Sequence, residues 1–226
     1  MNNNIQRLIP PVLKTGLLLV YIYLCYLMVK ICIQYFPWQN DRNFLLLKQD
    51  LVETQPWRIA FQVHVITSSL VLIAGFTQFF RIFRTRFPKI HRCSGWLYIT
   101  TVLLLALPSG FILAWSASGG FPTQLSFILL SVLWGISTLM ALRYALQKKW
   151  LKHRDWMIRS IALTLSALSL RSWKLILYDL QPYFEWLTPK HIYQLESWLG
   201  WVVNLLIAEI IILLLYRKKM HQKQKP

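Results

Sequence analysis

The sequence predicts an all-α, polytopic membrane helical bundle with six transmembrane helices and both termini in the cytoplasm. Two features of the composition support this fold class. Hydrophobic residues make up 56% of the chain and charged residues only 15%, whereas a soluble domain carries about 25% charged residues. Apolar stretches of roughly 20 residues, the length that crosses ~30 Å of hydrocarbon, also recur along the whole chain. We therefore expect one integral membrane domain over residues 1–226, with no separate soluble domain.

The first three spans are expected at about 12–36, 57–80 and 95–115. The first is too long for a signal-peptide core, and Pro37 and Trp38 after it suit a membrane interface rather than a cleavage site. This segment is therefore expected to stay in the membrane as an anchor. Pro108 lies within the third span and is expected to kink it, because proline removes a backbone hydrogen bond.

The last three spans are expected at about 123–146, 158–178 and 197–216. The pair Gly119-Gly120 predicts a tight turn between the third and fourth spans. Basic residues dominate the connection between the fourth and fifth spans. Residues 217–226 are expected to form a basic cytoplasmic tail.

Lysine and arginine gather on one side of this six-span arrangement, at both termini and in the second and fourth connections. Such residues are retained in the cytoplasm, so both termini are expected on the cytoplasmic side of a bacterial inner membrane. The net charge of +17 thus indicates topology and attraction to anionic membrane lipids, not nucleic-acid binding. Most acids are expected in the outer connections: Asp41, Asp50, Glu53, Asp179, Glu185 and Glu196.

Polar side chains on three spans are expected at one depth in the outer half of the membrane. Counting inward from the outer span ends, at ~1.5 Å per residue, places His64, Arg171 and Asn204 about 10 Å deep. Helical spacing adds Ser68 to the face of His64 and Lys174 to the face of Arg171. We call these five residues the outer cluster.

An anionic or lipid-like ligand is one interpretation of the outer cluster. A charge inside a span needs a partner, and no acid is expected at the level of Arg171. A carboxylate, a phosphate head group or a haem propionate would each suit the two cations. Two simpler interpretations stay open, because small residues on these faces also serve as packing seams and Lys174 could extend to the interface.

A second set of polar residues, the inner cluster, is expected at the cytoplasmic boundary. His91 and Arg92 precede the third span, and His153 precedes the fifth. Arg159, at the inner end of the fifth span, is expected to pair with Glu209 of the sixth. The cluster either forms a polar rim that holds head groups and caps helices, or provides a histidine pair that binds a metal or haem.

Several motifs occur together from the second span to the sixth. They are His64, Gly75, Gln78-Phe79, His91-Arg92-x-x-Gly95-x-x-Tyr98, Gly119-Gly120, His153-x-x-Trp156-Met157-x-Arg159-Ser160 and Arg171. This combination resembles the bacterial predicted membrane proteins of the domain of unknown function 2306 family. Trp96 stands where such proteins tend to carry arginine. The resemblance implies a membrane bundle and supports this choice of residues, but it implies no reaction.

Three functions are compatible with these residues. The first is a membrane protein that binds a small-molecule, quinone or lipid ligand at the outer cluster. The second is a redox protein that binds haem b through His64, His91 or His153 and passes electrons to quinone or ferric iron. The third is a structural or assembly subunit of a membrane complex. Hydrolase and nucleotide-binding motifs are absent from the sequence, so no catalytic residue is predicted and enzymatic activity stays undecided.

Overall fold

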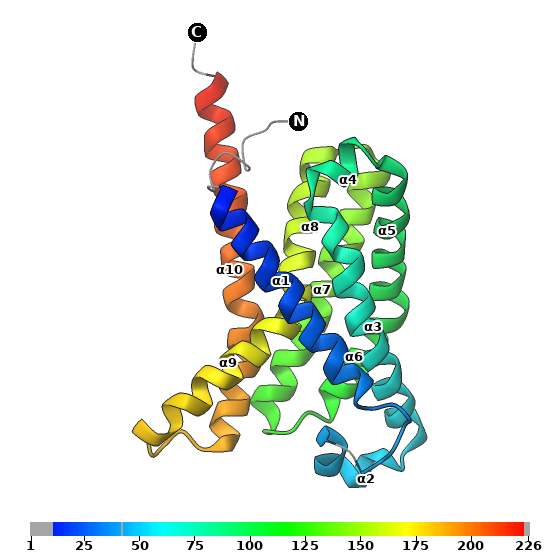
Figure 1. Ribbon diagram of the computed structural model, residues 1–226, viewed down its shortest axis with the longest axis vertical. Coiled ribbons are helices and arrows are strands. Elements are labelled where there is room, and N and C mark those ends of the chain that lie inside the picture. Colours follow the sequence, from blue (N-terminus) through cyan, green and yellow to red (C-terminus); the bar gives the residue numbers. More distant parts are fainter. Residues whose placement is uncertain (1–10, 42, 224–226) are drawn as a thin grey trace.

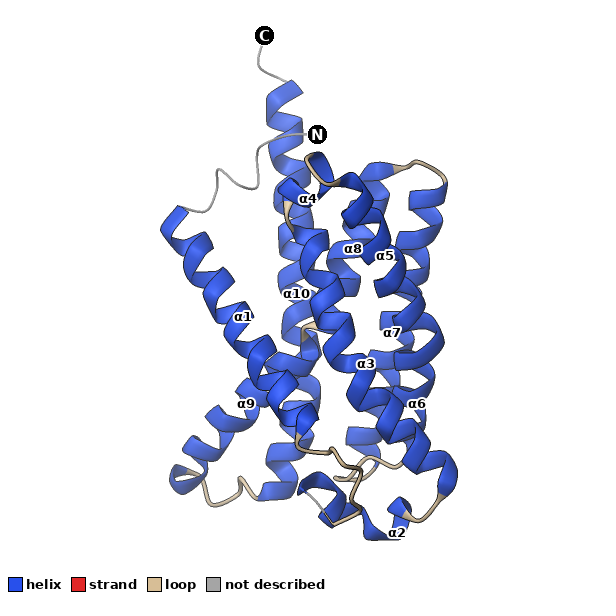
Figure 2. Ribbon diagram, turned by 45° about the vertical axis from the view of Figure 1, so that its right-hand side comes forward, coloured by secondary structure: helices blue, strands red, loops and turns tan. Residues whose placement is uncertain are grey.

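The computed structural model describes residues 11–41 and 43–223 and folds them into helices joined by short connections, with no strand in these ranges (Figures 1 and 2). The predicted all-α class is confirmed. The long elements are α1 (Pro11–Ile33), α3 (Gln55–Phe79), α5 (Pro88–Thr101), η2 (Val102–Ala106), α6 (Leu107–Trp115), α7 (Phe121–Leu146), α8 (Trp150–Thr164), α9 (Ser166–Leu180) and α10 (Pro189–Lys223). The short ones are η1 (Asn43–Lys48), α2 (Gln49–Val52), α4 (Arg81–Thr85) and η3 (Gln181–Tyr183).

Within the described residues, four helices are long and apolar enough to cross a membrane. They cover Gln55–Gln78, Pro88–Trp115, Phe121–Leu146 and Pro189–Arg217. Helices α8 and α9 form a fifth candidate. Only together are they long and apolar enough to cross a membrane, and they are bent by 42°. The apolar part of α1, Leu18–Ile33, is shorter. The structure therefore gives four to five candidate spans where the sequence predicted six.

The helices run up and down between two ends of the molecule (Figure 1). The start of α1, the short helix α4 and the end of α10 lie at one end, and α2 lies at the other. Helix α1 crosses the bundle diagonally, in contact with α3 and α9. Helix α9 diverges from α8 and pairs with the first half of α10. Helix α9 thus lies beside the α3–α8 bundle, and α10 packs on both α9 and the bundle.

Three helices begin earlier than the sequence predicted. Helix α5 begins at Pro88, α8 at Trp150 and α10 at Pro189. Hydropathy reports where a chain is apolar, whereas a helix continues until its backbone is capped. Proline at the first helical position is a start signal, and Pro88 and Pro189 provide it. Consequently the segments before the predicted span starts, which contain His91 and His153, are already helical.

The interruption expected at Pro108 takes the form of a π-helical segment, η2. The N–H of Leu107 donates to the carbonyl of Val102, which is the five-residue spacing of a π-helix. Proline lacks an N–H and crowds the turn before it, so this wider turn accommodates Pro108 while α5, η2 and α6 together remain one candidate span.

At the end of the molecule that carries α2, hydrogen bonds tie the segment after α1 to the end of α6. The Lys48 ammonium donates to the Ser116 carbonyl at 2.6 Å, and Trp57 Nε1 donates to Ser116 Oγ at 2.7 Å. Burial lowers the pKa of Lys48, because a partly desolvated ammonium loses hydration. These contacts hold η1 over the ends of α3 and α6.

The bundle core contains a buried hydroxyl network that joins α5, α7 and α8. The Tyr98 hydroxyl lies 2.8 Å from Ser160 Oγ and 2.7 Å from Thr164 Oγ1. Thr138 Oγ1 lies 2.7 Å from Ser160 Oγ. A Cβ at Gly75 would lie 3.4 Å from the Tyr98 ring, so glycine lets α3 close over the tyrosine. Three of the motif positions, Gly75, Tyr98 and Ser160, are therefore explained by packing around Tyr98.

We expect Tyr98→Phe to lower the free energy of unfolding by about 1–2 kcal/mol, because the buried hydroxyl contributes hydrogen bonds in a dry core. Unfolding of the purified protein in a mixed-detergent titration would measure this loss. Tyr23→Phe is the matched control, since Tyr23 is 60% exposed. Equal stability of the two variants would show that the network adds nothing to the fold.

Candidate functional site

The outer cluster is organised by α9 and by its close contact with α10. A Cβ at Gly200 would lie 3.2 Å from the Leu170 Cα, so only glycine lets the two backbones approach this far without a shift. The contact sets the rotation of α9 and directs Arg171, the next residue, towards α1, α3 and α10. Arg171 is within electrostatic range of Tyr35 and Cys32, and of His64.

Arg171 is a half-buried cation with few protein partners. Its Nη1 donates to the carbonyl of Ala167, one turn earlier in α9, at 2.5 Å. A guanidinium has five N–H donors. In the described part of the chain, the ion pairs within 4.0 Å are Arg154–Asp155 and Arg159–Glu209. The Arg171 charge is thus balanced only at longer range.

The His64 ring packs against Gly110 of α6. A Cβ at Gly110 would lie 3.4 Å from the His64 ring atoms Cε1 and Nδ1. The imidazole also reaches the backbone of Ala106, the last residue of the π-helical segment. His64 Nδ1 is buried and has no hydrogen-bond partner in the described structure. One polar atom of this ring is therefore available to a ligand.

Glu196 lies inside α10 and not in a connection between helices. We placed it in an outer connection and expected no acid at the level of Arg171, and this was wrong. Because α10 begins at Pro189, Glu196 lies in its second turn, where it is 1% exposed. Lys174 and Arg171 are its electrostatic neighbours. The four-residue spacing of Glu196, Gly200 and Asn204 on one helix face was the sequence signal for this position.

The other three predicted residues have different surroundings. Ser68 Oγ donates to the Val65 carbonyl of its own helix at 2.9 Å. Lys174 is exposed, with Nζ 5.8 Å from the Tyr178 ring centroid. Asn204 lies at the α8–α9 bend, where Nδ2 donates to the Ala162 carbonyl at 3.1 Å and Oδ1 accepts from Ser169 at 3.0 Å. The structure thus places Lys174 and Arg171 near Glu196 and His64 near Arg171, and Asn204 holds the bend.

A side cavity of about 290 Å³ opens beside this bend. Its lining comes from α1, α9 and α10, together with Leu165 of the bend, and is mainly apolar apart from Tyr21, Ser169, Ser172 and Asn204. It lies on the face of α9 that carries Leu168 and Trp173. A hydrocarbon chain is the kind of group that such a lining accommodates.

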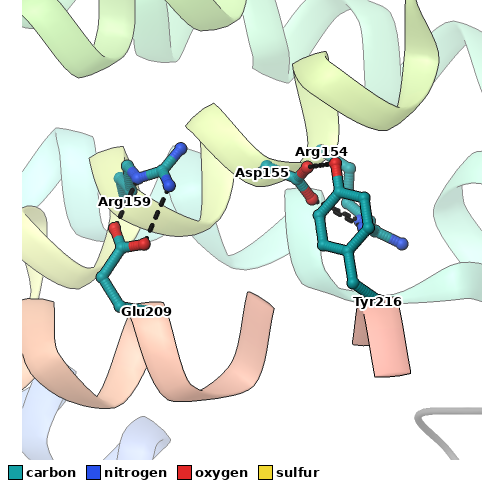
Figure 3. Close-up of polar contacts among 5 residues, drawn as sticks. All are labelled: Arg154, Asp155, Arg159, Glu209 and Tyr216. Carbon is teal, nitrogen blue, oxygen red and sulfur yellow. Dashed lines mark hydrogen bonds and ion pairs between the residues drawn. The ribbon is translucent and has the colours of Figure 1, made fainter. Parts of the chain in front are cut away.

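The inner cluster contains the predicted pair between Arg159 and Glu209 (Figure 3). Arg159 Nε lies 2.5 Å from Glu209 Oε1, and Nη2 lies 2.8 Å from Oε2. The guanidinium also lies 4.7 Å from the centroid of the Trp156 ring. Nearby, Asp155 pairs with Arg154 at 2.6 Å and accepts a hydrogen bond from Tyr216 at 2.7 Å. The Arg159–Glu209 pair and the Tyr216–Asp155 hydrogen bond tie α8 to α10.

The remaining inner residues mainly connect helices. His153 Nδ1 lies 2.8 Å from the Ala141 carbonyl of α7. Gln78 Nε2 donates to the His91 carbonyl at 3.1 Å, so α3 holds the start of α5. His91 Nδ1 is buried without a hydrogen-bond partner in the described structure, and His153 is within its electrostatic range. Arg92 is exposed. The described residues contain no group of three or more His, Cys, Asp or Glu side chains placed to hold a metal ion.

The fold and these polar clusters define a membrane protein with several apolar helices. Residues 61–212 match the model of the family described as "Predicted membrane protein (DUF2306)", and the chain belongs to this family. The matched region includes every residue of the outer and inner clusters, and Glu196 as well. No curated protein and no solved structure matches the chain.

Proposed function

We propose that this protein spans the membrane six times, with both termini cytoplasmic, and binds a small anionic or lipid-like molecule beside Arg171. The distribution of charge supports the topology. Arg84, Arg86 and Lys89 lie at the end of the molecule that carries α4, and this end also holds the start of α1 and the end of α10. Positive charge of this kind is retained on the cytoplasmic side. Arg171 then lies in the outer half of the bundle.

The observation that supports binding is that the Arg171 guanidinium has few hydrogen-bond and ion-pair partners in the described structure. It is half-buried in a span candidate, donates to one carbonyl of its own helix, and has no carboxylate within ion-pair distance in the described residues. An ionised side chain inside the membrane is costly without a close partner. A monoanionic group would accept hydrogen bonds from the unused N–H donors of Arg171. His64 Nδ1 and Lys174 would provide further contacts. The side cavity lined by Tyr21 and Trp173 suits an attached hydrocarbon chain.

Binding of a defined anionic lipid tests this proposal. The probe is dioctanoyl phosphatidylglycerol, titrated calorimetrically into protein purified in a neutral maltoside detergent. We expect Arg171→Gln to weaken binding at least tenfold, which corresponds to about 1.4 kcal/mol. Arg171→Lys should keep part of the affinity, because lysine retains the positive charge but lacks the planar set of N–H donors of the guanidinium. Arg143→Gln is the control, since Arg143 is exposed at the far end of α7.

Two further probes separate the sources of the anion. If glycerol phosphate binds with the same affinity as the lipid, the ligand is a free phosphate compound. If dioctanoyl phosphatidylcholine binds as tightly as dioctanoyl phosphatidylglycerol, the net charge of the lipid does not matter and the proposal is contradicted. Unchanged binding in Arg171→Gln would also contradict it. Loss of stability on extraction, rescued by co-expression with a partner, would instead support an assembly subunit.

A second candidate function rests on His91 and His153, which lie within electrostatic range of each other on α5 and α8. Two imidazoles from facing helices are the usual axial ligands of haem b, which would supply one-electron chemistry towards quinone or ferric iron. The buried Nδ1 of His91 is available for ligation, and His153 is oriented by the Ala141 carbonyl. Protein expressed with added haem should then show a Soret absorbance band that His153→Ala removes. Absence of the band in the unaltered protein would exclude this candidate.

A further inference from the structure

Glu196 is a buried acid without a close partner. Its side chain is 1% exposed, and its Oε2 accepts no hydrogen bond in the described structure. It lies one helical turn before Gly200, at the closest contact between α9 and α10. A buried carboxylate needs a cation or N–H donors, and among the described residues no Lys, Arg or His nitrogen lies within 4.0 Å of it.

The charged side chains that act on Glu196 electrostatically are both cations. Helix α9 contributes Lys174 and Arg171, and α10 itself contributes Tyr193. Three further groups act on or are acted on by Arg171: Cys32 of α1, Tyr35 just after α1, and His64 of α3. The titratable residues of the two other helices that pack on α10 lie nearer the opposite end: Arg143 and Tyr144 of α7, and Lys152, His153, Arg154, Asp155 and Arg159 of α8. Glu196 is therefore the acid that balances Arg171 and Lys174.

We propose that Glu196 takes up one proton from solvent when an anion binds beside Arg171, so that ligand binding and protonation are coupled. This inference rests on the proposed function. Without ligand, the Glu196 carboxylate offsets the two cations. A bound anion takes over that role, and two negative charges in one apolar site repel each other strongly. The proton goes to Oε2, and the resulting O–H donates a hydrogen bond to the ligand.

Geometry favours Glu196 over His64 as the group that takes the proton. Protonating His64 would place another positive charge beside Arg171, which already acts on it electrostatically. Protonating Glu196 instead removes the negative charge that competes with the ligand. It also gives Oε2, which accepts no hydrogen bond in the described structure, a proton to donate.

The test is the pH dependence of dioctanoyl phosphatidylglycerol binding, because its phosphodiester keeps one negative charge. Proton uptake on binding makes affinity fall as pH rises, by up to about tenfold per pH unit. Glu196→Gln mimics the protonated acid, so it should bind as tightly as the unaltered protein does at the lowest pH and show no slope. Glu185→Gln, which changes an exposed acid of the outer connection, should keep the slope.

A second measurement keeps the test decisive if Glu196→Gln does not fold. Calorimetry of the unaltered protein in two buffers of different ionisation enthalpy counts the protons bound, and we expect about one per ligand. Zero protons, or a full slope retained in Glu196→Gln, would overturn the coupling while leaving the binding site intact. No binding at any pH would instead refute the proposed function itself.

Discussion

Replacing Arg159 by methionine is expected to lower the free energy of unfolding by about 3 kcal/mol, because it leaves Glu209 as an unpaired acid inside a span. The side chains are 23% and 42% exposed, but Glu209 lies in an apolar candidate span, where the exposed surface is expected to face hydrocarbon rather than water. Water therefore cannot replace the two hydrogen bonds that the guanidinium donates. Unfolding in a mixed-detergent titration would give the difference.

The double variant Arg159→Met with Glu209→Met separates the pair from its parts. Removing both charges also removes the unpaired acid, so we expect most of the lost stability to return. Arg154→Met is the matched control: Asp155 still accepts a hydrogen bond from Tyr216 at 2.7 Å, and the loss should be smaller. A double variant as unstable as Arg159→Met would show that the side chains contribute packing rather than charge.

Replacing Gly200 by valine is expected to cost about 3 kcal/mol, because the added atoms meet backbone that cannot move aside. The first of them, Cβ, would lie 3.0 Å from Leu170 Cβ and 3.3 Å from Leu170 N. Helices α9 and α10 would have to separate, which also moves Arg171 away from Glu196. We therefore expect this variant to lose both stability and lipid binding.

Gly16→Val is the control for the glycine prediction, since a Cβ at Gly16 would meet nothing within 4 Å. Valine and glycine have similarly low helix propensity, so this change should be nearly neutral in α1. Thermal unfolding and phosphatidylglycerol binding of both variants would be compared. Normal binding by Gly200→Val would mean that the α9–α10 contact does not position the site.

Much of the architecture could be predicted because it depends on local sequence. The apolar stretches indicated helices, and α3 and α7 begin and end within two residues of the predicted spans. The pairing of Arg159 with Glu209 also followed from the sequence, since both are charged and expected at similar depth. The motifs around Gly75, Tyr98 and Ser160 identified the family that the comparison confirmed.

The partners of Arg171 could not be predicted in the same way. The sequence indicated that Arg171 and His64 lie at one depth, but Glu196 was assigned to a connection because its surroundings are polar. Its burial depends on where α10 begins and on the close approach at Gly200. Asn204, expected in the ligand site, lines the side cavity, but its bond to the Ala162 carbonyl at the bend after α8 could not be predicted.

The sequence alone therefore indicated the class and the family, and it predicted a depth in the membrane for the polar residues. These properties follow from hydropathy and charge along one helix at a time. The tertiary structure decided which polar residues face one another, because that depends on helix ends, on the 42° bend and on the rotation of α9 against α10. Packing between segments far apart in the chain sets all three, and it placed Glu196 beside Arg171.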